Sequence, residues 1–283
     1  MEYWLKEAHT AGTEFNVKIE RHLCSLKSKI QQIDIVDSTD FGRILVIDGL
    51  LMHTEKDGFI YHEMMVHPAM AVNPGIKDVL VIGVGNAGIT AELVKYKTIQ
   101  TIKIVETDES LVTLVKRFFP KNASALSDPR VSIEICDDMK FMRRADAGYD
   151  LIILDIPDPF GPGENYFTKE YYGNCYTAMR SDGILINQHE SCFYEDDRPA
   201  CQKAHKNSVK VFDISRVYQA SIPTYPSGHW LFGFSSKKFH PIKDIDKAAW
   251  KALNIKTQYY NANLHLGAFA LPTYVEKVLE VVE

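Results

Sequence analysis

The chain has 283 residues, 46% of them hydrophobic, so it can bury one large core or a large and a small one. Its formal net charge is -5, and its acidic and basic residues are mixed along the sequence. This pattern argues against a nucleic-acid-binding protein, which would need clustered lysine and arginine, and it mildly favours cationic ligands. No apolar stretch approaches the roughly 18 residues of a membrane-spanning helix, so no membrane contact is predicted.

Cysteine usage is typical of a reducing compartment. The chain has five cysteines, at positions 24, 136, 175, 192 and 201. They are odd in number and widely spaced, and none forms a Cys-x-x-Cys pair, so neither a disulfide framework nor a zinc site is predicted. The N-terminal residues contain no apolar run after a basic segment. We therefore expect a cytoplasmic protein.

The first elements along the chain predict a small β unit. Apolar residues tend to alternate over residues 14–48, and polar turn residues interrupt the alternation. This period of two is typical of short antiparallel strands and hairpins. A helix is predicted over residues 59–72, and Asn73-Pro-Gly75 predicts a loop after it. We place the domain boundary at this loop, so that residues 1–72 form an N-terminal β domain with a connecting helix.

Beyond this boundary, strand-like and helical segments alternate. The strand-like segments are residues 78–83, 102–105, 131–135, 151–154 and 183–186, and helices are predicted over residues 91–95 and 110–119. Uninterrupted apolar strands that alternate with helices predict an α/β domain, with a mostly parallel sheet covered by helices on both faces. This domain spans residues 73–283 and ends in a helical tail from Asp244 onward. Ligands bind beyond the carboxyl ends of the strands in such sheets.

Three successive strand ends carry residues suited to a nucleoside. Gly83-Val-Gly-Asn-Ala-Gly88 follows the first strand and allows close approach of the backbone to a ligand. Glu106 ends the second strand, where it can accept hydrogen bonds from both ribose hydroxyls. Asp137 ends the third strand, where it can accept from an adenine amino group. Either acid alone is more often a helix cap or a solvated loop residue, but the ordered set predicts a nucleoside pocket.

The fourth strand ends in two acids held in a proline-rich segment. Asp155 and Asp158 lie three residues apart in Leu154-Asp-Ile-Pro-Asp-Pro-Phe-Gly-Pro162. Carboxylates so close repel each other and resist burial, so a positively charged ligand is expected beside them. A dinucleotide dehydrogenase would share the glycine loop and Glu106 but would not need these two acids. An S-adenosyl sulfonium ligand also uses adenosine and adds a positive charge.

Five separated motifs follow one another in a recognisable order. They are Tyr61–Met65, Gly83–Gly88, Asp155–Pro162, Asn187–Ser191 and Pro223–Trp230. In this order they resemble the spermidine synthases, or polyamine aminopropyltransferases, and the likeness covers nearly the whole chain. The resemblance implies a Rossmann-like methyltransferase fold with a small N-terminal antiparallel β domain, assembled as a homodimer or homotetramer. It also implies transfer of an aminopropyl group from decarboxylated S-adenosylmethionine, a co-substrate and not a permanently bound cofactor, to putrescine.

The resemblance further implies roles for individual residues. The catalytic residues implied are Asp155, as general base, with Tyr61 and Tyr225. Residues implied or expected near the amines are His62, Asn86, Asp158, Glu190 and Trp230. Residues implied or expected at the nucleoside are Gln31, Gly83, Gly85, Glu106, Asp137, Asp138 and Pro162. No metal is implied.

The chemistry explains why acids are needed. Alkyl amines have pKa values near ~10, so the acceptor is protonated at neutral pH and has no lone pair for attack. A carboxylate at Asp155 can take the proton while Tyr61 and Tyr225 aim the nitrogen, and Asp158 with Glu190 can hold the distal ammonium. The sulfonium is already activated and leaves as a neutral thioether. Phe160 and Trp230 are expected along the methylene chain.

The sequence departs from the pattern of the family at five sites, one of them a dipeptide. They are Gly58, Asn86, Ile156-Pro157, Asp138 and Cys192. Asn86 stands where the family carries an aspartate that holds the ammonium of the donor, and loss of this charge should weaken binding of a cationic donor by about 1–3 kcal/mol. The alternatives are therefore a paralogue that uses S-adenosylmethionine or another amine acceptor, and a catalytically idle polyamine-binding protein.

Overall fold

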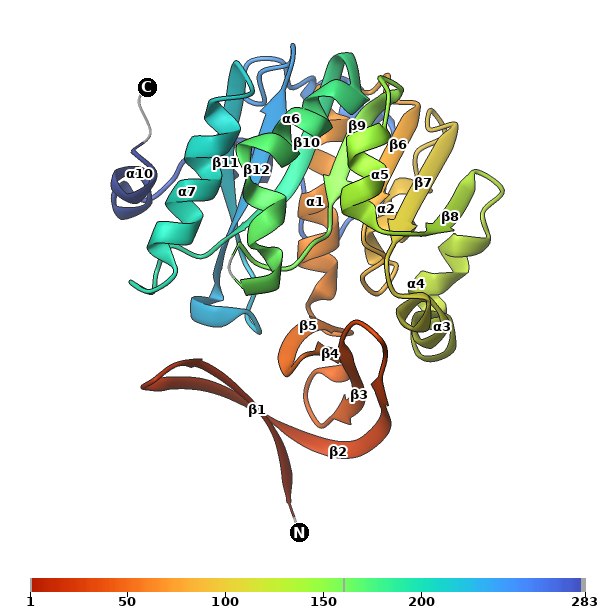
Figure 1. Cartoon of the computed structure of the whole chain (residues 1–283). Coiled ribbons are helices and arrows are strands. Elements are labelled where there is room, and N and C mark those ends of the chain that lie inside the picture. Colours follow the sequence, from red (N-terminus) through yellow and green to blue (C-terminus); the bar gives the residue numbers. More distant parts are fainter. Residues whose placement is uncertain (1, 160, 281–283) are drawn as a thin grey trace.

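A small antiparallel sheet forms the N-terminal part of the molecule (Figure 1). The structure is a computed structural model that describes residues 2–159 and 161–280. The strands of the small sheet, in spatial order, are β1 (Tyr3–Thr10), β2 (Thr13–Lys27), β3 (Gln32–Ser38), β4 (Gly42–Ile47) and β5 (Leu50–Thr54). The predicted antiparallel β unit is thus confirmed. The alternation pattern covered residues 14–48 and missed β1 and β5.

The large sheet has seven strands in the order β11-β12-β10-β9-β6-β7-β8. Their bounds are β6 (Asp78–Ile82), β7 (Thr101–Glu106), β8 (Val131–Ile135), β9 (Tyr149–Leu154), β10 (Met179–Glu190), β11 (Ile214–Ser221) and β12 (His229–Ser236). All neighbours pair in parallel except β12, which runs antiparallel to both β10 and β11. The sequence analysis had predicted β6, β7, β8, β9 and β10. It had not predicted β11 and β12. The predicted mostly parallel α/β sheet is confirmed.

Helices cover both faces of the large sheet, as predicted. Their bounds are α1 (Gly58–Val72), α2 (Gly88–Leu93), α3 (Glu109–Phe118), α4 (Pro120–Ala123), α5 (Asp138–Arg144), α6 (Lys169–Ala178), α7 (Arg198–Val209), α8 (Lys247–Ala252), α9 (Ala262–Ala268) and α10 (Thr273–Leu279). Alternate residues of one strand enter opposite cores: Val81 packs in the core that contains α1, whereas Leu80 packs in the core that contains α6. In Figure 1, α5, α6 and α7 lie in front of the sheet and α1 lies behind it. No helix of the described chain is long and apolar enough to cross a membrane.

The chain reverses its direction across the sheet between β6 and β9. These strands are hydrogen-bonded neighbours, although β7 and β8 separate them in the sequence. Gly83 and Asp155 follow the two strands, and the Asp155 N–H donates to the carbonyl of Ile82 at 2.8 Å. Gly83 has a φ of +92°, and a Cβ there would lie 2.1 Å from the carbonyl oxygen of Asp155, so only glycine fits. Such a reversal point is where open α/β sheets bind ligands.

Helix α1 is buried along nearly its whole length. All of its residues except Phe59 are buried, and it contacts β9, β10, β11 and β12 as well as α2. Its buried carboxylate Glu63 accepts three backbone N–H groups, from Gln258, Tyr259 and Tyr260, at 2.7–2.9 Å. Glu63 thereby ties the C-terminal segment to the core. The division into domains 1–72 and 73–283 stays a prediction.

Replacement of this carboxylate tests how strongly the C-terminal segment is held. We expect Glu63→Gln to lower the free energy of unfolding by about 2–3 kcal/mol, because a charged acceptor is lost and an amide group faces buried N–H donors. Urea denaturation followed by circular dichroism would measure the change. Glu20→Gln, at an exposed position of β2, is the matched control. Equal stability of the two variants would contradict this account of Glu63.

Candidate active site

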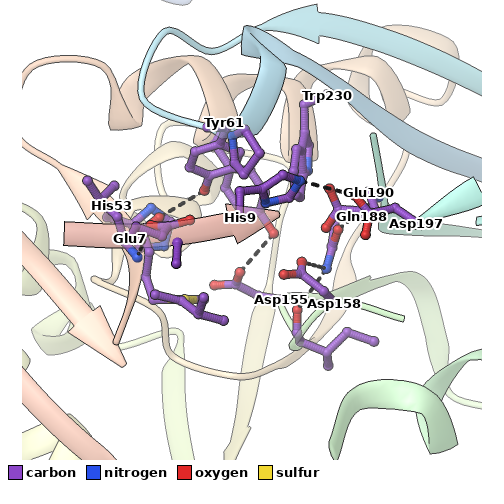
Figure 2. A pocket seen from close by; sticks show the side chains of 17 residues that line it. Glu7, His9, His53, Tyr61, Asp155, Asp158, Gln188, Glu190, Asp197 and Trp230 are labelled. Atoms are coloured by element: carbon purple, nitrogen blue, oxygen red, sulfur yellow. Dashed lines mark hydrogen bonds and ion pairs between the residues drawn. The ribbon is translucent and has the colours of Figure 1, made fainter. Parts of the chain in front are cut away.

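An acidic pocket lies where the small sheet meets the carboxyl ends of β9 and β10 (Figure 2). Its cavity volume is about 160 Å³. The small sheet contributes Glu7, Ala8, His9, Leu50, Leu51, Met52 and His53 to its lining. The remainder of the lining is Tyr61, Asp155, Ile156, Asp158, Gln188, Glu190, Asp197, Tyr225, Pro226 and Trp230. These described residues include five carboxylic acids and neither lysine nor arginine.

Asp155 and Tyr61 form a hydrogen-bonded pair in this pocket. The Tyr61 hydroxyl donates to Asp155 Oδ1 at 3.0 Å, and Tyr61 is only 4% exposed. Burial raises the pKa of Asp155 to about 7, although the hydrogen bond from Tyr61 opposes the shift. Gly85 makes room for the carboxylate, because a Cβ there would lie 2.3 Å from Asp155 Oδ2. The site therefore holds a carboxyl group that can both release and take up a proton near neutral pH.

Asp158 and Glu190 form a second acidic group, organised by Gln188. The Gln188 amide donates to Asp158 Oδ1 at 2.8 Å, and its oxygen accepts the Glu190 N–H at 3.1 Å. Burial raises the pKa of both acids, and repulsion from Asp158 raises the pKa of Glu190 further. Glu190 has a φ of +65°, which is strained for a residue with a side chain. Burial and mutual repulsion therefore both favour the protonated form of this pair.

The small sheet contributes an acid, Glu7, and a histidine, His9, that the sequence analysis missed. Glu7 Oε2 accepts the Leu51 N–H at 2.7 Å, and burial raises the pKa of Glu7 to about 7. His9 Nε2 lies 3.1 Å from Asp197 Oδ2. No periodic pattern in Tyr3–Thr10 indicated these contacts. Gln188, in contrast, stands two residues before Glu190 in one strand, and this spacing could have indicated it.

Tyr225 and Trp230 form an aromatic wall of the pocket. Their ring centroids lie 4.7 Å apart in an edge-to-face arrangement, and the ring of Tyr225 lies 6.0 Å from that of Tyr61. The Tyr225 hydroxyl donates to the carbonyl of Met52 at 2.9 Å and not to Asp155. Trp230 is 4% exposed, and its Nε1 has no hydrogen-bond partner among the described residues. The predicted residues Tyr61, Asp155, Asp158, Glu190, Tyr225 and Trp230 thus come together in one pocket.

His62, on α1, and Asn86, in the glycine loop, do not line the pocket. The ring of His62 fills the space beside Gly88, where a Cβ would lie 2.1 Å from His62 Cε1. Asn86 Oδ1 accepts the Gly88 N–H at 3.0 Å. Burial lowers the pKa of His62 well below its ordinary value, and it lowers that of His53 to about 4, so both rings are neutral. The side chains of Asn86 and His62, next to Gly88, are therefore polar and uncharged.

Of the predicted nucleoside residues, Glu106 ends β7, and Asp137 and Asp138 follow β8. Glu106 accepts the N–H groups of Val84 and Asp108 at 2.9 and 2.8 Å, and Gln31 donates to Asp108 Oδ2 at 3.1 Å. These bonds link the small sheet, the glycine loop and the end of β7. They fix the orientation of Glu106, whose contact with a ribose stays a prediction.

Asp137 and Asp138 point in different directions. Asp137 caps α5 through the Lys140 N–H at 2.9 Å, and its side chain is 44% exposed. Asp138 is buried and accepts the Tyr166 hydroxyl at 2.7 Å. Pro162 belongs to the 3₁₀ helix Gly161–Phe167, but its side chain and Phe160 lie outside the described residues. The predicted contacts of these residues with a nucleoside therefore stay predictions.

Comparisons with known proteins define the class of this site. The description "Spermine/spermidine synthase domain" matches residues 58–247, and "Spermidine synthase tetramerisation domain" matches residues 3–55. The chain therefore belongs to the spermine/spermidine synthase family. This result confirms the resemblance read from the five motifs.

Individual relatives agree with this assignment. Polyamine aminopropyltransferases of Clostridium beijerinckii and Alkaliphilus oremlandii are 54% and 52% identical to the chain, and each alignment covers at least 98% of both proteins. A solved spermidine synthase in complex with the transition-state analogue AdoDATO is 35% identical, with a TM-score of 0.95 over 99% of this chain and 96% of that one. The enzyme from Thermotoga maritima is 34% identical, with a TM-score of 0.93, over 99% and 95% of the two chains. The chain is thus a transferase with a Rossmann-like methyltransferase fold.

The hydrogen bond between Tyr61 and Asp155 can be tested directly. Tyr61→Phe removes the donor that stabilises the carboxylate, so the pKa of Asp155 should rise above about 7. Carbon-13 NMR of the aspartate carboxyl groups, titrated between roughly pH 5 and 9, would follow it. Tyr225→Phe is the matched control, because that hydroxyl bonds to Met52. An unchanged pKa in Tyr61→Phe, or an equal rise in both variants, would contradict the assigned geometry.

Proposed function

We propose that the chain transfers the aminopropyl group of decarboxylated S-adenosylmethionine to putrescine, giving spermidine and methylthioadenosine. The observation that carries this proposal is a carboxyl group with a pKa of about 7, Asp155, inside a pocket that has five acids and an aromatic wall. Such a pocket suits a flexible aliphatic dication better than an anionic or neutral substrate.

In this proposal Asp155 is the general base. The acceptor ammonium gives one proton to Asp155, and the nitrogen lone pair then attacks the carbon beside the sulfonium. The bond from that carbon to sulfur breaks, and its electron pair stays on sulfur as a neutral thioether. Tyr61 holds Asp155 Oδ1, so the carboxylate keeps a fixed orientation during the transfer. Positioning of this kind can lower a barrier by about 7–11 kcal/mol.

The other acids of the pocket bind the distal ammonium, which must stay charged. Asp158 and Glu190 hold it together with Glu7, and its positive charge compensates the burial that raises the pKa values of these groups. The methylene chain lies against Tyr225 and Trp230. The Trp230 Nε1–H, which is buried without a partner among the described residues, is free to donate to a bound water or substrate.

The donor lies across the glycine loop in this proposal. Its nucleoside contacts Gln31, Gly83, Gly85, Glu106, Asp137, Asp138 and Pro162, and its aminopropyl amine lies near His62 and Asn86. Because Asn86 and both nearby histidines are uncharged, a second candidate is a donor that also carries a carboxylate, namely S-adenosylmethionine. The products would differ by one carboxyl group on the amine.

We further propose a cytoplasmic homodimer or homotetramer that acts on small molecules only. The match of residues 3–55 to a tetramerisation domain supports an oligomer. Tyr3 and Trp4 on β1 are 61% and 54% exposed, which also supports a partner surface at this strand.

Substitution of the base tests the proposed reaction. Asp155→Asn should lower kcat/KM for putrescine by about 10²- to 10⁴-fold, because the variant cannot accept the proton. Mass spectrometry of spermidine and methylthioadenosine, formed from decarboxylated S-adenosylmethionine, would measure it. Asp40→Asn, at an exposed turn, is the control. Parent activity in Asp155→Asn would refute the role of Asp155, and absence of both products from the parent protein would refute the reaction.

A further inference from the structure

A histidine from the small sheet, His9, lines the acidic pocket beside Asp197. His9 Nε2 lies 3.1 Å from Asp197 Oδ2, and the two side chains are only 12% and 14% exposed. The ring of His9 also packs on Tyr194, with centroids 4.3 Å apart. Figure 2 shows His9 inside the ring of pocket residues, with its contact directed toward Asp197. His9 thus joins β1 to the loop that follows β10.

Hydrogen bonds to neighbouring segments fix the position of this loop, which carries Asp197. Ser191 Oγ lies 3.0 Å from Ser227 Oγ, and the Arg198 guanidinium donates to the carbonyls of Cys192 and Phe193 at 3.1 and 3.2 Å. These hydrogen bonds hold Asp197 in place beside His9. A ligand that extends past Asp158 and Glu190 would have to displace the His9 ring.

The charges of the pocket lead to the same conclusion. Asp155 serves the reacting amine, and Asp158, Glu190 and Glu7 surround the distal ammonium. Asp197 is the remaining acid among the described lining residues, and it already has a basic partner from the chain. His53, the other histidine of the lining, is neutral. The position that a third ammonium would take is therefore occupied by the imidazole of His9.

We propose that His9, held by Asp197, is a specificity-determining residue that limits the acceptor to diamines. A triamine such as spermidine carries a third ammonium beyond the distal site. This group meets the bulk of the imidazole, which already occupies the position beside Asp197. The inference rests on the proposed function, since it assigns the acceptor to this pocket.

Two substitutions of His9 test the proposal. His9→Ala removes the ring, and His9→Gln replaces the ring with an unbranched polar side chain. In each we expect the ratio of kcat/KM for spermidine to that for putrescine to rise about tenfold over the parent protein, because Asp197 is then free to accept a hydrogen bond from the third ammonium. Mass spectrometry of the tetraamine and triamine products at saturating donor gives the ratio. Circular dichroism confirms folding, and His9→Gln serves if His9→Ala does not fold.

His22→Ala is the matched control. His22 also pairs with an aspartate in the small sheet, at 3.2 Å from Asp34 Oδ1, but it is exposed and outside the pocket, so its ratio should equal that of the parent. Equal use of both amines by the parent, or an unchanged ratio in folded His9 variants, would overturn the proposal. If the parent forms no spermidine, the proposed function fails. Calorimetry of putrescine and spermidine binding would then still decide whether His9→Ala selectively gains affinity for the triamine.

Discussion

The burial of acids without basic partners is the constraint on which this site depends. Asp155, Asp158, Glu190 and Glu7 share one pocket with no lysine or arginine in its described lining, and burial raises the pKa of each. An isolated carboxylate in such surroundings is unfavourable until it binds a proton or a cation. A dicationic amine satisfies these groups and supplies the proton that Asp155 must accept. Recognition and catalysis therefore use the same electrostatic property of the pocket.

The pocket with its buried acids forms where the small antiparallel sheet meets the large, mostly parallel sheet. The parallel sheet reverses its strand order between β6 and β9, so the glycine loop and Asp155 emerge side by side. The glycines at 83 and 85 are required there, because the backbone and carboxylate of Asp155 fill the space of a side chain. The small sheet closes the pocket and contributes Glu7 and His9. Neither sheet alone could keep the acids away from water.

Much of the fold and part of the site could be predicted from the sequence. The alternation of apolar strands and helices predicted the large sheet, and the motifs placed Tyr61, Asp155, Asp158, Glu190, Tyr225 and Trp230 in one pocket. Glu7, His9 and Asp197 could not be predicted, because their proximity arises from β1 meeting a loop that lies 188 residues away from His9. For the same reason the sequence did not indicate that His62 and Asn86 lie outside the lining of the pocket, or that the Tyr225 hydroxyl bonds to Met52.

The most direct test of the electrostatic account is the number of protons released when putrescine binds. Calorimetry at pH 7 in buffers with different ionisation enthalpies measures this number. Asp155 and Glu7, with pKa values of about 7, are partly protonated in the free protein and should ionise when the diamine arrives. The account predicts net proton release at pH 7 that declines as the pH is raised above the two pKa values. A binding heat that is independent of the buffer at pH 7 would contradict it.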